Sequence, residues 1–396
     1  MRSPKLAMRT LTAVLAVAGL ALAGCSSSKS KSNSAPSGSI KLGGIFTNTP
    51  FPFGADPQKI AKEVFNEVNA QGGIGGRKID YMTGDDGEQP TTAAQLARKY
   101  VGAGAVAMVS SASFIDCGTN AGYYQKQNIL SIEAIGADPF CFNSPNIAPV
   151  NLGPFSSITA DLYYASKFLN DKKICLFQPA TPGTSAAVAA AVDRWTKITG
   201  QKLFIDDHNL PQNQTDLSPE LLRAKSAGCD AFFYGGGDAV AASILKNAKN
   251  QGMQDVDFLF VAVAYTTQLA KTSGGLGLKV YLASEFNPFT LTDDANAAWR
   301  QTAIKAGANQ TSFAQGGYVA ANWIVSILKS IKGPITRDSV TKALQTGGTY
   351  QSPMVGSPLT FGGAKAHAPN QAVKMVTLKD GAWQVVNDQY FSLPAS

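Results

Sequence analysis

The sequence predicts an α/β protein built from two successive units, each with a parallel β-sheet covered by helices on both faces. Three observations carry this prediction. The chain has 396 residues, a length that suits two domains better than one. Hydrophobic residues make up 44% and charged residues 15%, a balance typical of chains that bury large cores. Strand and helix patterns alternate from residue 40 onward, and the alternation restarts after the segment 146–154.

The first unit begins with the strand pattern IKLGGIF at 40–46. A helix should follow, with Asp56 as its N-cap and Pro57 at its first position, because both residue types favour those places. Ile60, Val64 and Val68 keep helical spacing on one face. Further strands are expected at 77–83, 106–110 and 129–132, with helices at 91–101 and 116–127 between them.

The second unit should begin with a helix that Ser156 or Ser157 caps and that ends near Leu169. Strands are expected at 173–178, 202–206, 230–235, 257–263 and 279–284, with helices at 184–199 and from 218 onward. Helices return at 293–306, 315–331 and 336–345. The end of the chain reads as two alternating strands around Asp380 and Gly381, which predicts a hairpin.

The N-terminus predicts export. A basic start precedes an apolar run and then Cys25, which is the layout of a secretory signal peptide over residues 1–24. The ending LAGC resembles a bacterial lipobox and implies cleavage before Cys25 and lipidation of its thiol; an ordinary signal peptide with an incidental cysteine is the alternative. Residues 25–38 are rich in serine and should form a flexible tether. We therefore expect a protein anchored by lipid on the extracytoplasmic face of a membrane.

Charge and cysteine content narrow the class of partner. Five of the positive charges that make up the net +7 lie before residue 33, so the rest is near neutral and we expect no nucleic-acid partner. Four cysteines follow Cys25, and an even number in an exported protein suggests disulfides, with three possible pairings. Proximity in the sequence favours Cys117 with Cys141 and Cys175 with Cys229.

Motifs for catalysis are missing from the sequence. There is no phosphate loop, no HExxH and no GxSxG, and the chain has two histidines and no CxxC. FFYGGGDA at 232–239 places glycines between a strand and a helix, but its spacing fits neither nucleotide-binding fingerprint. We therefore expect no enzyme activity, no cofactor and no metal.

Small polar segments follow several predicted strands, at the ends where open α/β sheets bind ligands. They are residues 47–54, 110–113, 133–138, 178–184, 235–238 and 262–267. The segment SSAS at 110–113 lies before a helical run, and helix N-termini favour anions such as carboxylates. Ordinary capping by serine is the alternative.

Several segments of the sequence resemble one known protein family. Residues 40–101, with the pattern N-A-x-G-G-I-x-G at 69–76 and the pair Asp85–Asp86, closely resemble the first segment of bacterial leucine/isoleucine/valine-type solute-binding proteins. FFYGGGDA and FLFVAVAY fall where that family has its second-lobe binding loops. The resemblance extends over about 39–390 and is looser in the last third.

The resemblance implies a type 1 periplasmic binding protein fold, with two Rossmann-like lobes joined by three crossovers that close on a ligand. We place the crossovers near Asn151, Glu285 and Phe361. The first lobe would comprise 39–150 with 287–360, and the second 151–286 with 361–396. The implied activity is capture of a small solute by a monomer and delivery to the permease subunits of an ABC importer.

The resemblance also implies ligand-binding residues in the first lobe. The ligand carboxylate would be bound by the first-lobe serine loop, Ser110, Ser111, Ala112 and Ser113. Backbone atoms of Ala134 and Gly136 would contact the ligand from the next loop, where the family has a threonine at the position of Gly136. Phe53 would cover the ligand, with Phe51 beside it.

The second lobe departs from the family pattern. Amino-acid binders of this kind contact the ligand ammonium with a tyrosine, where this chain has Gly237, and with a glutamate, where VAVAYT offers Tyr265 but no acid. Either Asp238 or Glu133 replaces the acid, or the ligand has no ammonium. The alternatives are a helix cap for Asp238 and a solvated loop acid for Glu133.

The sequence thus predicts a binder of a small carboxylate or amide that is hydrophobic, aromatic or amino-acid-like. A binder of branched-chain amino acids and a ligand-sensing receptor are the alternatives.

Overall fold

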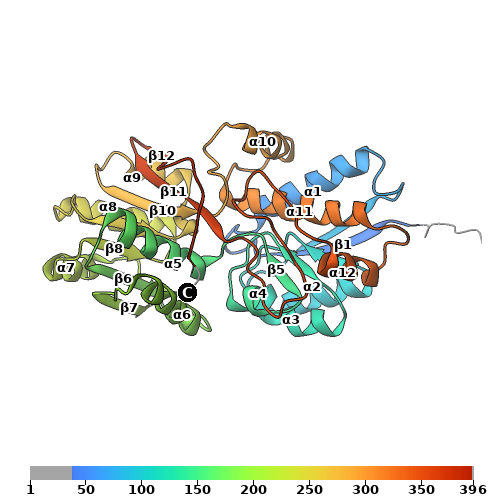
Figure 1. Ribbon diagram of the computed structural model, residues 1–396, viewed down its shortest axis with the longest axis horizontal. Coiled ribbons are helices and arrows are strands. Elements are labelled where there is room, and N and C mark those ends of the chain that lie inside the picture. The colour runs from blue at the N-terminus through green and yellow to red at the C-terminus, as the bar shows by residue number, and fades with distance from the viewer. Residues whose placement is uncertain (1–37, 395–396) are drawn as a thin grey trace, which may run out of the picture. The chain divides into compact units, whose positions relative to one another are not determined.

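The computed structural model describes residues 38–394, so the predicted signal peptide, Cys25 and nearly all of the tether lie outside the described residues. The first sheet has five strands in the order β2-β1-β3-β4-β5, and all of its pairs are parallel. Its strands are β1 (Ile40–Phe46), β2 (Ile79–Asp85), β3 (Ala107–Val109), β4 (Ser131–Glu133) and β5 (Ile147–Pro149) (Figure 1).

The helices of the first sheet come from two distant parts of the chain. The early ones are α1 (Ala55–Ala70), α2 (Pro90–Gly102), α3 (Asp116–Lys126) and α4 (Pro139–Asn143). The later ones are α10 (Asp294–Ala306), α11 (Ser312–Ser330) and α12 (Arg337–Thr346). Figure 1 shows the orange α11 beside the blue α1. Gly317 permits this packing, because a Cβ there would lie 2.7 Å from backbone atoms of Pro57.

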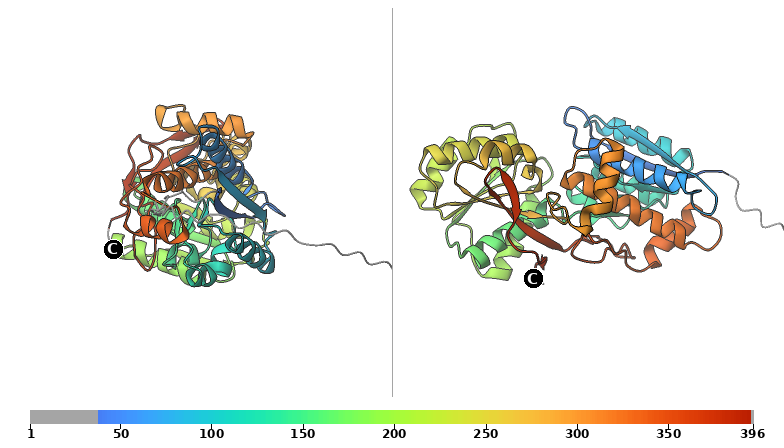
Figure 2. Two further views of the ribbon diagram at one scale, coloured as in Figure 1. Left: turned by 90° about the vertical axis from the view of Figure 1, so that its right-hand side faces the viewer. Right: turned by 90° about the horizontal axis from the view of Figure 1, so that it is seen from above.

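The second sheet has eight strands and contains the end of the chain. Its main path is β12-β11-β10-β9-β8-β6-β7, and β13 (Phe391–Ser392) pairs with β11. The parallel strands are β6 (Ile174–Pro179), β7 (Ile205–Leu210), β8 (Ala231–Tyr234), β9 (Asp257–Phe260) and β10 (Lys279–Ser284). Strands β11 (Ala372–Lys379) and β12 (Ala382–Val385) are antiparallel, and Figure 2 shows β11 in red on this sheet.

The second sheet is covered by helices from the middle of the chain. They are α5 (Pro154–Tyr164), which continues as a π-helical turn at Ala165–Leu169, α6 (Ser185–Thr199), α7 (Ser218–Ala227), α8 (Asp238–Asn250) and α9 (Thr267–Ser273). A short 3-10 turn, Ala262–Ala264, follows β9. The prediction of two α/β units with parallel sheets is therefore confirmed. The lobe boundaries at residues 150, 286 and 360 stay a prediction.

The sequence correctly predicted a hairpin but misplaced two helix caps. The predicted hairpin is present, and Asp380 and Gly381 both have positive φ (51° and 77°), as a two-residue type I′ turn requires. The two predicted helix caps are wrong. Helix α1 begins at Ala55, so Asp56 lies in its first turn and accepts a hydrogen bond from Asn309 N at 3.0 Å. Helix α5 begins at Pro154, before Ser156 and Ser157.

Both favoured disulfides are present. Cys117–Cys141 joins α3 to α4 beside the first sheet, and Cys175–Cys229 joins β6 to the segment before β8 in the second. The sequence separations of 24 and 54 residues correspond to about 3 and about 4 kcal/mol in a chain-entropy treatment. Each bond therefore stabilises one sheet with its own helices.

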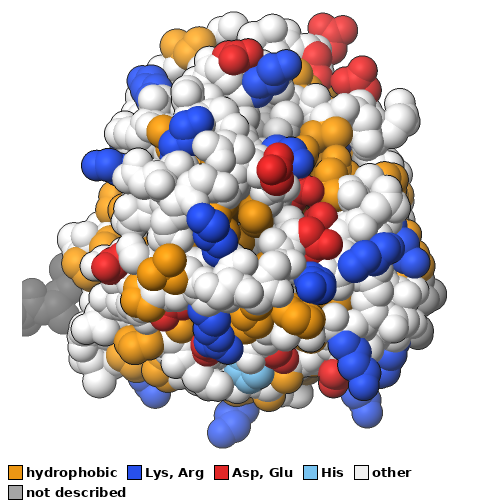
Figure 3. Space-filling model, turned by 90° about the vertical axis from the view of Figure 1, so that its left-hand side faces the viewer, with side chains coloured by type: hydrophobic (Ala, Val, Ile, Leu, Met, Phe, Trp, Pro, Cys, Tyr) orange, Lys and Arg blue, Asp and Glu red, His pale blue; other side chains and the backbone are white. Residues whose placement is uncertain are grey.

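The surface gives no sign of a large patch of one charge on the face that Figure 3 shows, where basic, acidic and hydrophobic side chains are interspersed. This distribution agrees with the near-neutral body that the sequence predicts. Within residues 38–394, no helix combines the length and the apolar character needed to cross a membrane.

Candidate functional site

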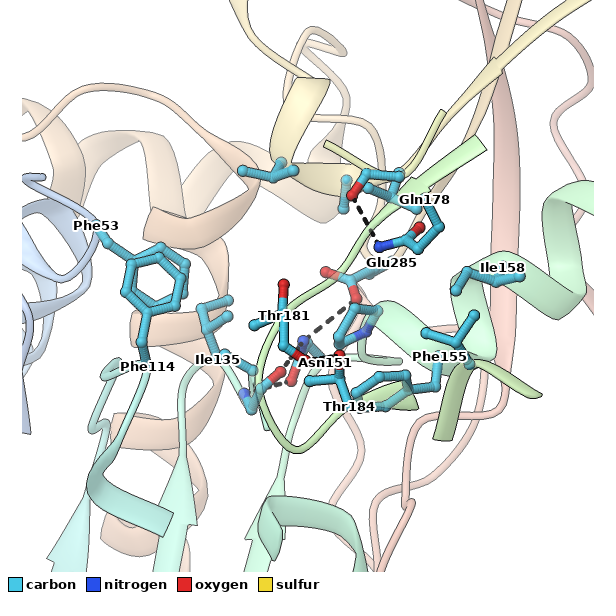
Figure 4. Close-up of a pocket in the computed structure, with 18 of the residues that line it drawn as sticks. Phe53, Phe114, Ile135, Asn151, Phe155, Ile158, Gln178, Thr181, Thr184 and Glu285 are labelled. Carbon is cyan, nitrogen blue, oxygen red and sulfur yellow. Dashed lines mark hydrogen bonds between the residues drawn. The ribbon is translucent and has the colours of Figure 1, made fainter. Parts of the chain in front are cut away.

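A cavity of about 230 Å³ lies where loops from both sheets meet. Its walls include residues that follow β1, β3 and β4 in the first sheet, and β6, β8, β9 and β10 in the second. These are the carboxyl ends of parallel strands, where open α/β sheets bind ligands. The cavity is therefore the candidate binding site, and Figure 4 shows it in close-up.

Aromatic rings form the first-lobe wall of the cavity. Phe53 stacks on Phe114 with ring centroids 4.2 Å apart, and the ring of Phe313 from α11 meets Phe53 edge-on at 5.0 Å. We call Phe53, Phe114 and Phe313 the aromatic wall. Phe53, which the resemblance implies covers the ligand, thus lines the cavity, while Phe51 is 63% exposed and does not. Gly136, also predicted, lines the cavity as well.

The opposite side of the cavity is largely apolar. Phe155 and Ile158 come from α5 and Val188 from α6, and Figure 4 shows Phe155 and Ile158 across from Phe53 and Phe114. Val261 and Val263 follow β9, at the loop where relatives would place an acid. A ligand in this cavity would thus contact hydrocarbon on two sides, which favours an apolar body.

Glu285 is the acid in the cavity wall. It follows β10, is 2% exposed, and accepts hydrogen bonds at Oε1 from Gly153 N at 2.8 Å and from Asn151 Nδ2 at 3.2 Å. Burial raises the pKa of Glu285 to about 7, although the hydrogen bonds from Gly153 and Asn151 act in the opposite direction by favouring the charged form. Glu285 therefore titrates near neutral pH.

Gln178 places a second polar group in the same cavity. Its Nε2 donates to Gly235 O at 3.4 Å, and its Oε1 is buried without a partner among the described residues. Gly235 is required for this approach, because a Cβ at that position would collide with the Gln178 amide. The first glycine of FFYGGGDA thus makes room for Gln178. Gly237 does not line the cavity, and a Cβ there would have no neighbour within 4 Å.

The predicted serine loop does not line the cavity. Ser110 Oγ donates to Gly317 O at 3.3 Å, and Ser111 Oγ accepts from Ile45 N at 3.1 Å. Ser113 Oγ donates to the buried Asp86 carboxylate. All three serines are buried, as are the predicted backbone contacts Ala112 and Ala134, which also lie outside the cavity lining. Binding of a ligand carboxylate by this loop stays a prediction for which the structure offers no exposed hydroxyl.

The predicted second-lobe residues also lie away from the cavity. Asp238, in the first turn of α8, accepts from Thr266 Oγ1 at 2.8 Å. Tyr265 is buried, with its ring 4.4 Å from Phe289 and 5.2 Å from Trp383. Neither residue lines the cavity, because each is engaged in packing or hydrogen bonding within its own surroundings.

Glu133, the other acid considered for an ammonium, is not a solvated loop residue. It is buried at the end of β4, accepts from the Ser131 hydroxyl, and lies outside the cavity lining. Burial and the nearby Asp116 hold the pKa of Glu133 well above its usual range. The acid that does reach the cavity, Glu285, entered the sequence prediction only as a crossover position. It could have been found by applying the strand-end rule to the predicted strand at 279–284 as well.

Comparisons with known proteins agree with this geometry. A family model described as periplasmic binding protein matches residues 40–382. A Brucella abortus (strain 2308) protein named Leu/Ile/Val-binding protein homolog 1 is 22% identical over 303 residues, which is 76% of this chain and 80% of that protein.

Two solved structures show the same fold. The branched-chain amino acid transporter substrate binding protein LivJ from Streptococcus pneumoniae, in complex with isoleucine, has a TM-score of 0.72 and 17% identity, covering 90% of this chain and 100% of its own. A solute binding protein from R. palustris, in complex with 4-hydroxybenzoate, has a TM-score of 0.70 and 17% identity, covering 89% of this chain and 97% of its own.

Proposed function

The chain belongs to the periplasmic binding protein family, and from that premise we propose that it is a lipid-anchored extracytoplasmic receptor that delivers a small ligand to an ABC importer. Proteins of this family bind solutes and do not transform them, so the chain is a binding protein and not an enzyme. The observation that carries the proposal is the cavity between Phe53 on one side and Phe155 on the other, with Glu285 in its wall.

The cavity supports a small ligand with an apolar body and a polar group. The aromatic wall and the side chains of Phe155, Ile158 and Val188 would cover the body, and Glu285 and Gln178 would meet the polar group. A small hydrophobic, aromatic or amino-acid-like compound fits this description. The two solved relatives were crystallised with isoleucine and 4-hydroxybenzoate, compounds that both combine an apolar part with polar ends.

The proposed mechanism is ligand-stabilised closure. Groups in the cavity wall come from both sheets, so one ligand can contact both at once. A ligand that contacts both sides binds the closed conformation more tightly than the open one. The closed population therefore rises by a factor set by the difference between the two affinities.

The proposed anchor lies outside the described residues and needs its own test. Wild-type protein expressed in its natural host should partition into detergent with the membrane fraction, and Cys25→Ala protein should not. Intact-mass measurement should show acyl chains on the wild type only. Detergent partition that is unchanged in Cys25→Ala would contradict the anchor and leave the binding function intact.

Native mass spectrometry tests the binding function. Protein purified without a denaturing step should carry a small molecule, and a thermal-shift screen of amino acids, amines, amides and aromatic acids should show at least one stabilising compound. A ligand at 100 times its Kd would add about 2.7 kcal/mol of stability. Loss of that stabilisation in a Phe155→Asp variant would place the ligand in the cavity. Chemical conversion of the ligand during prolonged incubation would contradict a pure binding role.

A further inference from the structure

Two hydrogen-bond acceptors in the cavity have no donor among the described residues. Glu285 Oε1 receives both hydrogen bonds from Gly153 N and Asn151 Nδ2, and none reaches Glu285 Oε2. Gln178 Oε1 is buried and unpartnered, while Nε2 of the same amide donates to Gly235 O. A buried acceptor without a donor is costly, so Gln178 Oε1 favours a ligand that brings an N–H group. Glu285 Oε2, in the same cavity wall, is open to a second N–H group.

The charge of the cavity wall points the same way. Among the described residues, the wall contains Glu285 and no lysine, arginine or histidine. No lysine, arginine or histidine among the described residues forms an ion pair with Glu285. Asp161 on α5 is buried, accepts from Ala283 N at 2.8 Å, and has a pKa that burial raises well above its usual range. Lys374 on β11 donates to Asn287 Oδ1 at 3.0 Å.

A purely structural role explains only one of the two carboxylate oxygens of Glu285. Gly153 is the residue before α5, and a carboxylate that accepts its N–H is a favourable cap for a helix N-terminus. That role uses Oε1. It does not account for Glu285 Oε2, which receives no hydrogen bond from the described residues and belongs to an acid of the cavity wall.

Resting on the proposed function, we propose that Glu285 selects the ligand, and that the ligand is a small amine without a carboxylate. Its ammonium donates to Glu285 Oε2 and to Gln178 Oε1, and its apolar body lies between the aromatic wall and the side chains of Phe155 and Ile158. Figure 4 shows Glu285 between Gln178 and Asn151, with these apolar groups on either side.

The absence of a carboxylate follows from the same contacts. A ligand carboxylate needs donors, and the serines predicted to supply them are engaged in internal hydrogen bonds. The Thr184 hydroxyl in the cavity wall donates to Thr181 O, which leaves the neutral hydroxyl of Thr181 and no cationic side chain to meet a carboxylate there. The N-terminus of α5 already has the Glu285 carboxylate as its anion. A second carboxylate beside ionised Glu285 would be repelled. An amine should therefore bind more tightly than the amino acid with the same side chain.

Two matched sets of probes test this inference by isothermal titration calorimetry. 3-Methylbutylamine, leucine and 4-methylpentanoate share one apolar body, and 2-phenylethylamine, phenylalanine and 3-phenylpropanoate share another. We expect at least one of the amines to bind about tenfold or more tightly than its amino acid and its acid. Glu285→Gln should weaken amine binding about 30-fold or more, because the ammonium loses its counter-charge.

Asp238→Asn is the matched control, since it removes an acid of the second lobe that lies outside the cavity, and it should leave affinity unchanged. A pH series on the wild type gives a second readout if Glu285→Gln folds poorly. Binding of an ammonium requires ionised Glu285, so amine affinity should rise about tenfold between about pH 6 and about pH 8, given a pKa of about 7. Carboxylate probes should show the opposite trend.

The outcomes separate the two proposals. The inference would be overturned if the carboxylate probes bound more tightly than both amines, or if amine affinity were equal in Glu285→Gln and wild type. Either result would leave the proposed solute binding in place. Failure of both amines to bind would also overturn it. If, in addition, no molecule co-purifies and no compound in the wider screen stabilises the protein, the proposed function fails as well.

Discussion

The side-chain amide of Asn151 donates to Glu285 Oε1 at 3.2 Å and thereby joins the segment after β5 to the segment after β10. The same amide exchanges two hydrogen bonds with the backbone of Gly136, at 2.8 and 3.2 Å. Asn151 thus orients the buried acid and fixes the neighbouring cavity wall. Its effects on stability and on the titration of Glu285 should be separable.

Asn151→Ala should destabilise the protein by about 1–3 kcal/mol, because the backbone groups of Gly136 lose their buried partners. It should also raise the pKa of Glu285 further, because the hydrogen bond from Asn151 favours the ionised form. The pH at which amine binding is half-maximal should then move upward from about 7. Denaturant unfolding and the pH series of binding measure the two effects, and exposed Asn66→Ala serves as the control. An unchanged midpoint would contradict the assigned hydrogen bond.

Phe53→Ala should weaken ligand binding roughly three- to tenfold, because the ligand loses one ring of the aromatic wall and Phe114 loses its stacking partner. Phe51→Ala is a strict control, since Phe51 is two residues away and 63% exposed. Calorimetry on both variants with the same ligand makes the comparison. Equal losses in the two variants would mean that the ligand does not contact the aromatic wall.

Ser113→Ala should lower stability by about 1–3 kcal/mol and leave the affinity of the folded protein unchanged. The hydroxyl donates to the buried Asp86 carboxylate and accepts from Ile115 N at 3.1 Å and Asp116 N at 2.9 Å, so its loss leaves buried groups unpaired. Thermal unfolding and calorimetry distinguish the two effects. A weakened ligand affinity with unchanged stability would instead support the anion-binding role that the sequence predicted for this loop.

Asp171→Asn should stabilise the protein at high pH more than at low pH. Burial, together with the charges of Asp257 and Asp230, raises the pKa of Asp171 to about 7. The folded-state pKa of Asp171 is raised above its unfolded value, so folding favours the protonated carboxyl. The stability that this carboxyl contributes is fully present below the unfolded pKa and is lost as pH rises through about 7. The variant should therefore melt about 2–5 °C above wild type at about pH 8, with a smaller difference at about pH 5. Differential scanning calorimetry at both values tests this, and a pH-independent difference would contradict it.

The periodic elements of the fold were accessible from the sequence. The apolar spacing of Ile60, Val64 and Val68 predicted α1, and all three side chains are buried. Asp380–Gly381 predicted the hairpin because the turn needs positive φ at both residues. The predicted cap positions are wrong by two residues for α1 and by three or four for α5, since capping depends on where the chain enters the helix. Gly153, with φ of 87°, determines that entry for α5.

The candidate site was only partly predictable. Phe53 and Gly136, two of the residues predicted to contact the ligand, line the cavity, because both follow strand ends. Knowing that a serine follows a strand does not tell in which direction its hydroxyl points. Ser110 donates to Gly317, 207 residues later in the chain, and only the packing of α11 reveals that partner. Glu285 directly follows β10, so the strand-end rule gives its position, but its hydrogen bonds to Asn151 and Gly153 join segments more than 130 residues apart and could not be read from the local pattern.

The last strands have a consequence for the order of synthesis. Strand β11 pairs with β10, which was made about 90 residues earlier, and carries β12 on its other edge. A nascent chain that has emerged up to residue 360 therefore exposes β10 as an open edge, available for pairing with other chains. The second sheet is completed only when the C-terminal hairpin arrives, after nearly the whole polypeptide has been made. A premature stop before Ala372 would yield an aggregation-prone chain and not a smaller receptor.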